Sequence, residues 1–283
     1  MEPLRDDLIL QHVRAALAED VGSGDVTTLA TIPENLTCVA RMVAREPMCV
    51  AGLGLATVAF RELSSDVTLQ LAAQDGERVA KGTALLTVTG STRATLTAER
   101  VALNFTQRLS GVATLTAQFV DAVRGTSARI LDTRKTTPGW RHLEKYAVAC
   151  GGGQNHRLGL WDMVLIKDNH LAAMRDAKPN AIAAAVQRAR ERSPSLKVEV
   201  EADTLEQVAQ VVEAGADIVL LDNMSLDQLR AAVKLVAGCA KTEASGGVNL
   251  QTARAIAETG VDFISVGALT HSARAVDIGL DFE

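Results

Sequence analysis

The residue types able to bind anions or move protons are concentrated between positions 129 and 170. Three of the five histidines lie in this segment: His142, His156 and His170. Its cations outnumber its acids, although the whole chain has a formal charge of −5. The basic residues are Arg129, Arg134, Lys135, Arg141, Lys145, Arg157 and Lys167, and the acidic residues are Asp132, Glu144, Asp162 and Asp168. A local positive field in an acidic molecule predicts a site for a small, strongly anionic ligand, since a nucleic-acid surface would spread its basic residues more widely.

Charged and glycine residues also follow short apolar runs, at the points where buried strands would end. They are Arg134 and Lys135, Lys167 and Asp168, Glu201, Asp222 and Asn223, Ser245-Gly246-Gly247, and Gly267-Ala268. The active site of a βα-barrel gathers at the C-terminal ends of its strands, so we expect these residues to converge. The two small, glycine-containing ends match the phosphate site after the last two strands of many barrels, where backbone N–H groups approach the anion.

Two carboxylates are expected beside this phosphate site. Glu199 and Glu201 alternate along one predicted strand and share a face, with Glu201 nearer to the ligand end. Together with Asp222 on the next strand, Glu201 could hold Mg²⁺ and ribose hydroxyls, or stabilise a developing cation. The alternative is a strand-end ion pair of Glu201 with Lys167 or Lys135.

The elements that must position these residues are predicted by the apolar pattern after residue 128. Short runs rich in Ile, Val and Leu lie at 128–133, 163–168, 197–202, 217–223, 241–247 and 262–268. Helical patterns lie between them, at 181–192, 204–215, 225–238 and 250–260. The last four strands recur about every 20 residues. This alternation predicts an α/β fold built on a parallel βα-barrel, which is incomplete because it has fewer strands than a closed barrel.

The first part of the chain has a different pattern. Residues 6–18 have the apolar spacing of an amphipathic helix, and short β-like runs with turn signals follow from Ala40 to about Gly90. One of these phrases resembles the hairpin of lipoyl and biotinyl carriers, but Lys81 lacks the flanking methionines, so only the β architecture is shared. Residues 97–124 predict a long helix with a break at Ser110-Gly111.

The composition excludes several classes. No apolar run approaches the ~20 residues of a membrane span, and the acidic start MEPLRDD predicts neither a signal nor a transit peptide. The cysteines, Cys38, Cys49, Cys150 and Cys239, have no CxxC spacing. We therefore expect reduced, buried thiols in a cytoplasmic protein and no zinc site.

The segment DTRKTTPGWRHLEKYAVACGGGQNHRLGLWDMVLIKDNH closely resembles the signature region of quinolinate phosphoribosyltransferases, the carboxylating nicotinate-nucleotide pyrophosphorylases of NAD biosynthesis. Further similar motifs are LAEDVGSGDVTT, TAERVALNFTQRLSGVAT, EVEAD, LLDN, EASGGV and ISVGALTHSARAVDIGLDF. The resemblance covers nearly the whole chain, and its motifs are long and specific.

The resemblance implies two domains. Residues 1–110 would form an N-terminal α/β sandwich domain, completed by 270–283, and residues 111–269 an open, seven-stranded α/β-barrel catalytic domain. The seventh strand would then be hidden near 155–160. The resemblance also implies a homodimer in which the sandwich of one subunit covers the barrel mouth of the other, so that Arg100 reaches the neighbouring site. Further assembly is left open, and neither a nucleic acid nor a membrane is expected as a partner.

The reaction implied by the resemblance joins quinolinate to phosphoribosyl pyrophosphate with Mg²⁺ and releases pyrophosphate and CO₂. Quinolinate would be bound by Arg100, Arg134, His156 and Arg157, with Lys135 and Lys167 shared between quinolinate and pyrophosphate. Glu201 and Asp222 would stabilise the oxocarbenium-like ribose and hold its hydroxyls or the metal, directly or through water. The 5′-phosphate would lie on Ser245, Gly246, Gly247 and Gly267, with His271. Lys135, Lys167, Glu201 and Asp222 are the predicted catalytic residues.

Three other functions are weighed against this one. A phosphoribosyltransferase for nicotinate would need fewer cations, because its substrate has a single carboxylate. A phosphosugar aldolase or isomerase would need a Schiff-base lysine or a lone base at a strand end, for which Lys167 qualifies. A carrier domain would be modified at Lys81. The other class of phosphoribosyltransferase is excluded, because VLLDNMS has one acid and no Thr-rich turn.

Overall fold

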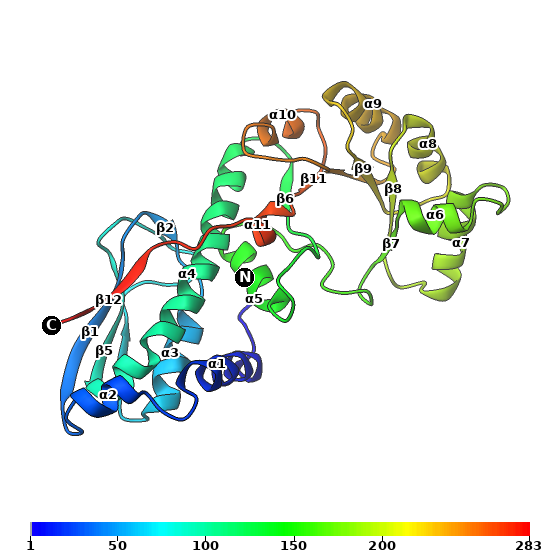
Figure 1. Ribbon diagram of the computed structural model, residues 1–283. Coiled ribbons are helices and arrows are strands. Elements are labelled where there is room, and N and C mark those ends of the chain that lie inside the picture. Colours follow the sequence, from blue (N-terminus) through cyan, green and yellow to red (C-terminus); the bar gives the residue numbers. More distant parts are fainter. Residues whose placement is uncertain (1) are drawn as a thin grey trace. The chain divides into compact units, whose positions relative to one another are not determined.

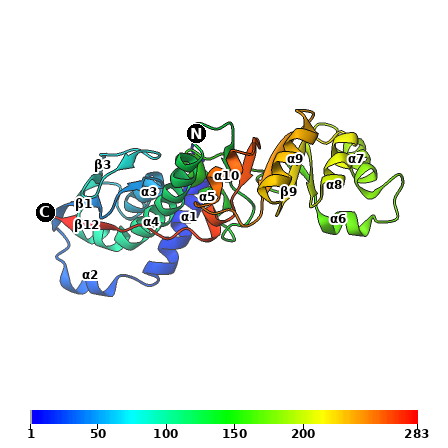
Figure 2. The same ribbon diagram turned by 90° about the horizontal axis from the view of Figure 1, so that it is seen from above.

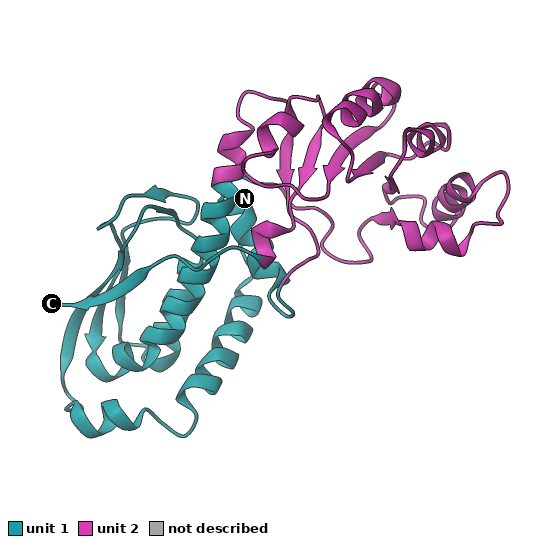
Figure 3. Cartoon of the chain, turned by 45° about the horizontal axis from the view of Figure 1, so that its top comes forward, with its two compact units in different colours: residues 1–117, 137–152, 272–283 teal, residues 118–136, 153–271 magenta. Residues whose placement is uncertain are grey.

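The computed structural model describes residues 2–283, and the chain divides into two compact units (Figure 3). Unit 1 comprises residues up to 117, together with 137–152 and 272–283. Unit 2 comprises residues 118–136 and 153–271. The sequence predicted boundaries at residues 110 and 270, which would place residues 137–152 in the barrel domain. In the structure these residues belong to unit 1.

Unit 1 contains an antiparallel sheet of four strands in the order β12-β1-β5-β3 (Figure 1). These strands are β12 (Ile278–Phe282), β1 (Thr37–Ala44), β5 (Ala84–Ser91) and β3 (Thr68–Leu71). A separate pair is formed by β2 (Met48–Cys49) and β4 (Arg78–Val79). Because β12 pairs with β1, the last residues of the chain complete a sheet that the first hundred residues begin.

Helices supply the second layer of unit 1. They are α1 (Asp6–Val21), α2 (Val26–Thr31), α3 (Leu53–Leu63), α4 (Thr92–Ala122, whose last residues belong to unit 2) and α5 (Arg141–Cys150). Helices α3 and α4 cover one face of the four-stranded sheet (Figure 1). Met42, Phe60 and Leu86 are fully buried in the core of this sandwich.

The predicted break at Ser110-Gly111 is wrong, because α4 continues through both residues. The Ser110 hydroxyl bonds the backbone N–H of Ala51 at 2.9 Å and its C=O at 3.1 Å, so it serves another segment and leaves the helix intact. A Cβ atom on Gly111 would lie 2.0 Å from the carbonyl oxygen of Arg274. Close packing of a neighbouring backbone, rather than a turn, explains this glycine.

Residues 137–152 belong to unit 1 through side-chain contacts that the apolar pattern does not contain. The ring of Trp140 stacks on Phe105 of α4 with a centroid separation of 5.1 Å. Buried Glu144 accepts hydrogen bonds from both the backbone and the hydroxyl of Thr137, and pairs with Arg108 of α4 at 3.1 Å.

Unit 2 contains a wholly parallel sheet in the order β6-β11-β10-β9-β8-β7 (Figure 1). Figure 2 shows the same unit, with its helices, from above. The strands are β6 (Arg129–Leu131), β7 (Val164–Ile166), β8 (Val198–Ala202), β9 (Ile218–Asp222), β10 (Lys241–Ser245) and β11 (Phe263–Ser265). Each lies inside one of the six predicted runs. The helices are α6 (Asp168–Ala173), α7 (Ala181–Arg192), α8 (Leu205–Glu213), α9 (Leu226–Val236), α10 (Ala253–Ala257) and α11 (Ala268–His271).

The sheet of unit 2 is an open barrel, as predicted. Its edge strands β6 and β7 do not pair with each other anywhere in residues 2–283. The expected seventh strand is reduced to one parallel bridge, between Gln154 and Leu131 of β6. The predicted α/β class is therefore confirmed, with six strands in place of seven.

Within the described residues, every helix is too short or too polar to cross a membrane. All four cysteines are free thiols. Cys49 and Cys150 are buried as expected, whereas Cys38 is partly exposed and Cys239 is exposed, which corrects the expectation that all four are buried.

Candidate active site

A cavity of about 560 Å³ lies within unit 2, at the carboxyl ends of its parallel strands. Ten of the predicted site residues line it: Arg134, Lys135, His156, Arg157, Lys167, Glu201, Asp222, Ser245, Gly246 and Gly247. The parallel register explains this convergence, because Asp222 pairs with Ser245 and Glu201 with Leu220, so residues far apart in the chain end at one edge. The roles of these residues remain predictions.

Three predicted residues lie outside the cavity lining. Gly267 and His271 are close to it, since a Cβ atom on Gly267 would lie 3.0 Å from Lys135 Cδ and 3.1 Å from His271 Nε2. Arg100 is an exposed residue of α4 and belongs to unit 1.

Two guanidinium groups carry the positive charge of the cavity wall. The Nε of Arg134 is buried, and its N–H donates no hydrogen bond to any acceptor in residues 2–283. The pKa of Arg157 is lowered, first by burial and then by the neighbouring charge of Arg134, although the charges of Glu199 and Asp162 oppose this. One donor of Arg157 bonds the carbonyl of Met163 at 3.2 Å. Two such cations repel each other, so a planar anion accepting from both would relieve the repulsion.

Carboxylates gather on the neighbouring strand ends. Glu201 accepts a hydrogen bond from Lys167 Nζ at 2.6 Å, so the strand-end ion pair considered as an alternative is present. Asp222 accepts one from the Asn223 amide at 2.6 Å. Ligand oxygens of Glu201, Asp203 and Asp222 lie within 4.8 Å of one another, close enough for one cation. An all-oxygen set of this kind suits Mg²⁺. Asp203, which follows the end of β8, was not predicted from the sequence.

The loop after β10 has the backbone that an anion site needs. Gly246 and Gly247 both have positive φ, of 95° and 60°. A Cβ atom on Gly246 would lie 2.1 Å from Asn223 Oδ1, so a side chain there would strike the neighbouring strand end. Two successive left-handed glycines leave backbone N–H groups accessible to a phosphate.

Buried Asp132, absent from the predicted site, holds the segment that carries His156 and Arg157. Its carboxylate accepts from the Asn155 amide at 2.7 Å and from the His156 backbone N–H at 2.8 Å. The sequence contained a signal for Asp132, because this acid directly follows the first strand of the barrel and precedes Arg134 and Lys135 in the same loop.

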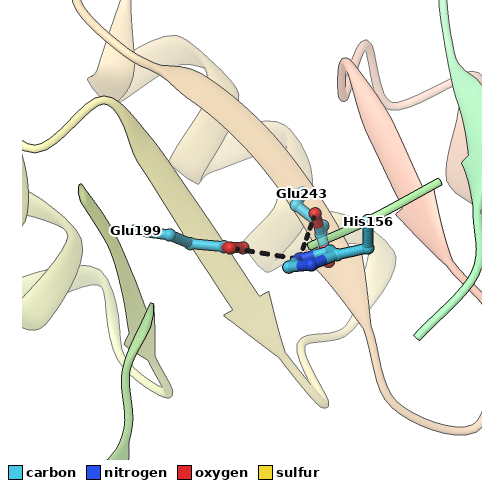
Figure 4. Close-up of side chains that lie close together, drawn as sticks. All are labelled: His156, Glu199 and Glu243. Atoms are coloured by element: carbon cyan, nitrogen blue, oxygen red, sulfur yellow. Dashed lines mark ion pairs between the residues drawn. The ribbon is translucent and has the colours of Figure 1, made fainter. Parts of the chain in front are cut away.

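A buried cluster of His156, Glu199 and Glu243 lies at the same edge (Figure 4). The Nε2 atom of His156 is 3.1 Å from Glu199 and 3.5 Å from Glu243. Its Nδ1 atom accepts the backbone N–H of Arg157 at 2.8 Å. From the sequence, Glu201 was predicted for the site in preference to Glu199, and Glu243 was not predicted. The available signal was a carboxylate in the middle of each of two strands predicted to be buried on both faces.

Comparison with known proteins identifies the family. The family described as "Quinolinate phosphoribosyl transferase, C-terminal domain" matches residues 112–281, and the corresponding N-terminal domain family matches residues 25–110. The chain belongs to the quinolinate phosphoribosyltransferase family.

Relatives within this family match along most of their length. A carboxylating nicotinate-nucleotide pyrophosphorylase of Mycobacterium leprae is 46% identical over 97% of each chain. A probable one of Bacillus subtilis is 42% identical over 93% of this chain and 89% of its own. The solved structure of the nicotinate-nucleotide pyrophosphorylase from Francisella tularensis has a TM-score of 0.93 at 39% identity, covering 99% of this chain and 98% of that one.

Proposed function

We propose that this chain transfers a phosphoribosyl group from phosphoribosyl pyrophosphate to quinolinate with loss of CO₂, giving nicotinate mononucleotide and pyrophosphate. This makes it a pentosyltransferase of NAD biosynthesis. Membership of the quinolinate phosphoribosyltransferase family supports the proposal. The observation that carries it is the composition of one cavity. Its lining contains two guanidinium groups, two neighbouring carboxylates and two successive glycines with positive φ: Arg134 and Arg157, Glu201 and Asp222, and Gly246 and Gly247.

The cationic wall matches the charge of quinolinate. Adjacent carboxylates on a pyridine ring form a planar dianion, which guanidinium forks bind bidentately. We assign Arg134 and Arg157 to these carboxylates, with Lys135 and Lys167 between quinolinate and pyrophosphate. His156 shapes the same wall, and its two ring nitrogens face Glu199 and the Arg157 N–H.

The remaining walls suit the ribose phosphate. Glu201 and Asp222 would hold ribose hydroxyls and stabilise the positive charge that develops at the ribose carbon during transfer. Together with Asp203 they would hold Mg²⁺, which neutralises pyrophosphate charge. Ser245, Gly246, Gly247 and Gly267, with His271, would receive the 5′-phosphate.

Loss of CO₂ needs no base. Once the ring nitrogen carries the ribose, its positive charge stabilises the electron pair left on the adjacent carbon. The protein has only to orient the ring and supply one proton to that carbon.

We further propose that the chain acts as a homodimer in the cytoplasm, with Arg100 completing the site of the partner. Support for Arg100 is its exposed position on α4 and the family resemblance of the motif that contains it. Support for a reducing compartment is the absence of disulfides among the four cysteines, all of which the structure describes.

An assay with carboxyl-labelled quinolinate tests this function. We expect CO₂ release that requires both phosphoribosyl pyrophosphate and Mg²⁺, and no nucleotide product when nicotinate replaces quinolinate. Turnover of nicotinate without CO₂ release would contradict the proposal and favour the monocarboxylate enzyme. Trapping of a carbonyl substrate on Lys167 by borohydride would favour the aldolase alternative instead.

A further inference from the structure

The cluster of His156, Glu199 and Glu243 presents an imbalance of charge. The Glu199 and Glu243 side chains are 0% and 1% exposed, and His156 is 7% exposed. No hydrogen bond of ordinary geometry reaches any of the four carboxyl oxygens from residues 2–283, although the Ser265 hydroxyl lies near Glu243. Two ionised carboxylates this close in a dry environment would be strongly destabilising, so the cluster must hold an additional proton.

The hydrogen bonds indicate where that proton lies. Nδ1 of His156 accepts the backbone N–H of Arg157, so it carries no proton and the ring is neutral. The ring proton is then on Nε2, which lies nearer to Glu199, at 3.1 Å, than to Glu243, at 3.5 Å. The additional proton is therefore on a carboxyl group, and Glu243 is the one without the nearer donor. Burial, and then the negative charge of Glu199, raise the pKa of Glu243, while the neighbouring His156 ring, the Ser265 hydroxyl and the charge of Lys167 lower it less.

Glu243 is also the member of the pair that lines the cavity. Three of the other donors of the wall are poor acids for this purpose. The guanidinium groups of Arg134 and Arg157 do not release protons in proteins, and Lys167 is ion-paired with Glu201 at 2.6 Å. A neutral carboxylic acid next to a carbanion can transfer its proton.

We propose that Glu243 is the acid that protonates the pyridine ring after loss of CO₂, and that Glu199 and His156 are positioning residues that keep it protonated. The inference rests on the proposed function. The carbon–carbon bond to the departing carboxylate breaks, and its electron pair stays on the ring carbon beside the alkylated nitrogen. That pair forms a carbon–hydrogen bond with the proton of Glu243, whose carboxylate then takes a proton from water after product release. One proton is consumed for each CO₂ released.

Infrared spectroscopy tests the protonation state independently of activity. We expect wild-type protein at neutral pH to show the C=O stretching band of a buried protonated carboxylic acid. Glu243→Gln should remove this band, and Glu206→Gln, an exposed glutamate of α8, should leave it unchanged. Absence of the band from the wild type, or its persistence in Glu243→Gln, would overturn the proposal even if the enzyme turns over quinolinate.

Kinetics test the role of the proton. For Glu243→Gln we expect kcat to fall by about 100-fold or more, the usual range for loss of a general acid, with little change in KM for phosphoribosyl pyrophosphate. In Glu199→Gln the alkaline fall in kcat should move to lower pH, because the charge that holds the proton on Glu243 is gone. Besides Glu199, the charged or titratable groups that face Glu243 are His156 and Lys167, and both variants leave them unchanged.

Two results would refute the role while leaving the proposed function standing. One is a kcat for Glu243→Gln within about threefold of wild type, against an expected loss of ~100-fold. The other is an unshifted pH profile in Glu199→Gln. If Glu243→Gln does not fold, Glu243→Asp replaces it, and an unchanged pH profile in that variant counts equally against the proposal. Failure of the wild type to release CO₂ would instead reject the proposed function.

Discussion

At the residue scale, the cavity wall is organised by unbalanced charge. Arg134 has a buried Nε without a hydrogen-bond partner among the residues described. Its positive charge contributes to lowering the pKa of the neighbouring Arg157. A wall of this kind is stabilised when an anion binds. The same charges attract anionic substrates towards a cavity in a molecule that is acidic as a whole.

We predict that Arg134→Ala lowers kcat/KM for quinolinate by about 10- to 150-fold, since a charge-assisted hydrogen bond contributes ~1.5 to 3 kcal/mol. Arg188→Ala, on the exposed side of α7, is the matched control and should behave as wild type. Steady-state kinetics with both variants measure the effect. Activity of Arg134→Ala within about twofold of wild type would remove Arg134 from the site.

A protonated Glu243 should also make the free energy of unfolding depend on pH. Its pKa is raised in the folded protein above the ordinary carboxyl value of 4.5. Between 4.5 and the raised value the folded state therefore binds more protons than the unfolded state, so this residue lowers the free energy of unfolding as pH rises. We expect the free energy of unfolding of Glu243→Gln, relative to wild type, to increase from pH 4.5 towards neutral pH. Urea unfolding across this range measures the difference, and a difference independent of pH would contradict a protonated Glu243.

At the scale of the elements, glycines in helices have opposite roles in unit 1. Gly111 of α4 allows the backbone at Arg274 to pass, because a Cβ atom would lie 2.0 Å from its carbonyl oxygen. Gly54 of α3 has room for a methyl group, whose nearest neighbour would be Ile9 Cδ1 at 3.6 Å.

We therefore predict that Gly111→Ala destabilises the protein by about 3 kcal/mol, at the upper end for overpacking, because a backbone segment must move. Gly54→Ala should stabilise it by about 0.5 to 1 kcal/mol, since alanine favours the helix. Thermal or urea unfolding of both variants measures this contrast. Equal effects of the two substitutions would show that the contact at Arg274 does not constrain α4.

At the scale of the whole molecule, the proposed dimer can be tested by mixing two impaired variants whose intact residues complement each other. Arg100→Ala and Arg134→Ala should each lower activity by about 10-fold or more. If Arg100 serves the partner, a mixed dimer of the two variants has one site with both arginines intact, so mixing and reassociation should restore activity. If Arg100 serves its own subunit, every site in the mixture lacks one arginine and activity stays low. Assays before and after mixing at fixed total protein distinguish the two results.

The amino-acid sequence by itself predicted the strands of unit 2, its helices α7 to α10 and most of the cavity lining. Strands buried on both faces appear as apolar runs, so all six were located from Arg129 to Ser265, and the residue ending each run marks the ligand edge. Arg134, Lys167, Glu201, Asp222 and Gly246 could be identified in this way because each lies at the end of its own strand or shortly after it. These signals are local in the sequence, so they can be recognised without knowledge of the tertiary contacts.

Only the tertiary structure decided what depends on neighbours distant in the chain. The continuity of α4 at Gly111 reflects a segment more than 150 residues later, and Trp140 belongs to unit 1 because Phe105 lies under it. The proton assigned to Glu243 requires His156 and Glu199, which come from two other segments of the sheet edge. A carboxylate in a strand has no fixed protonation state by itself, because its pKa is determined by burial and by the charges that folding brings beside it.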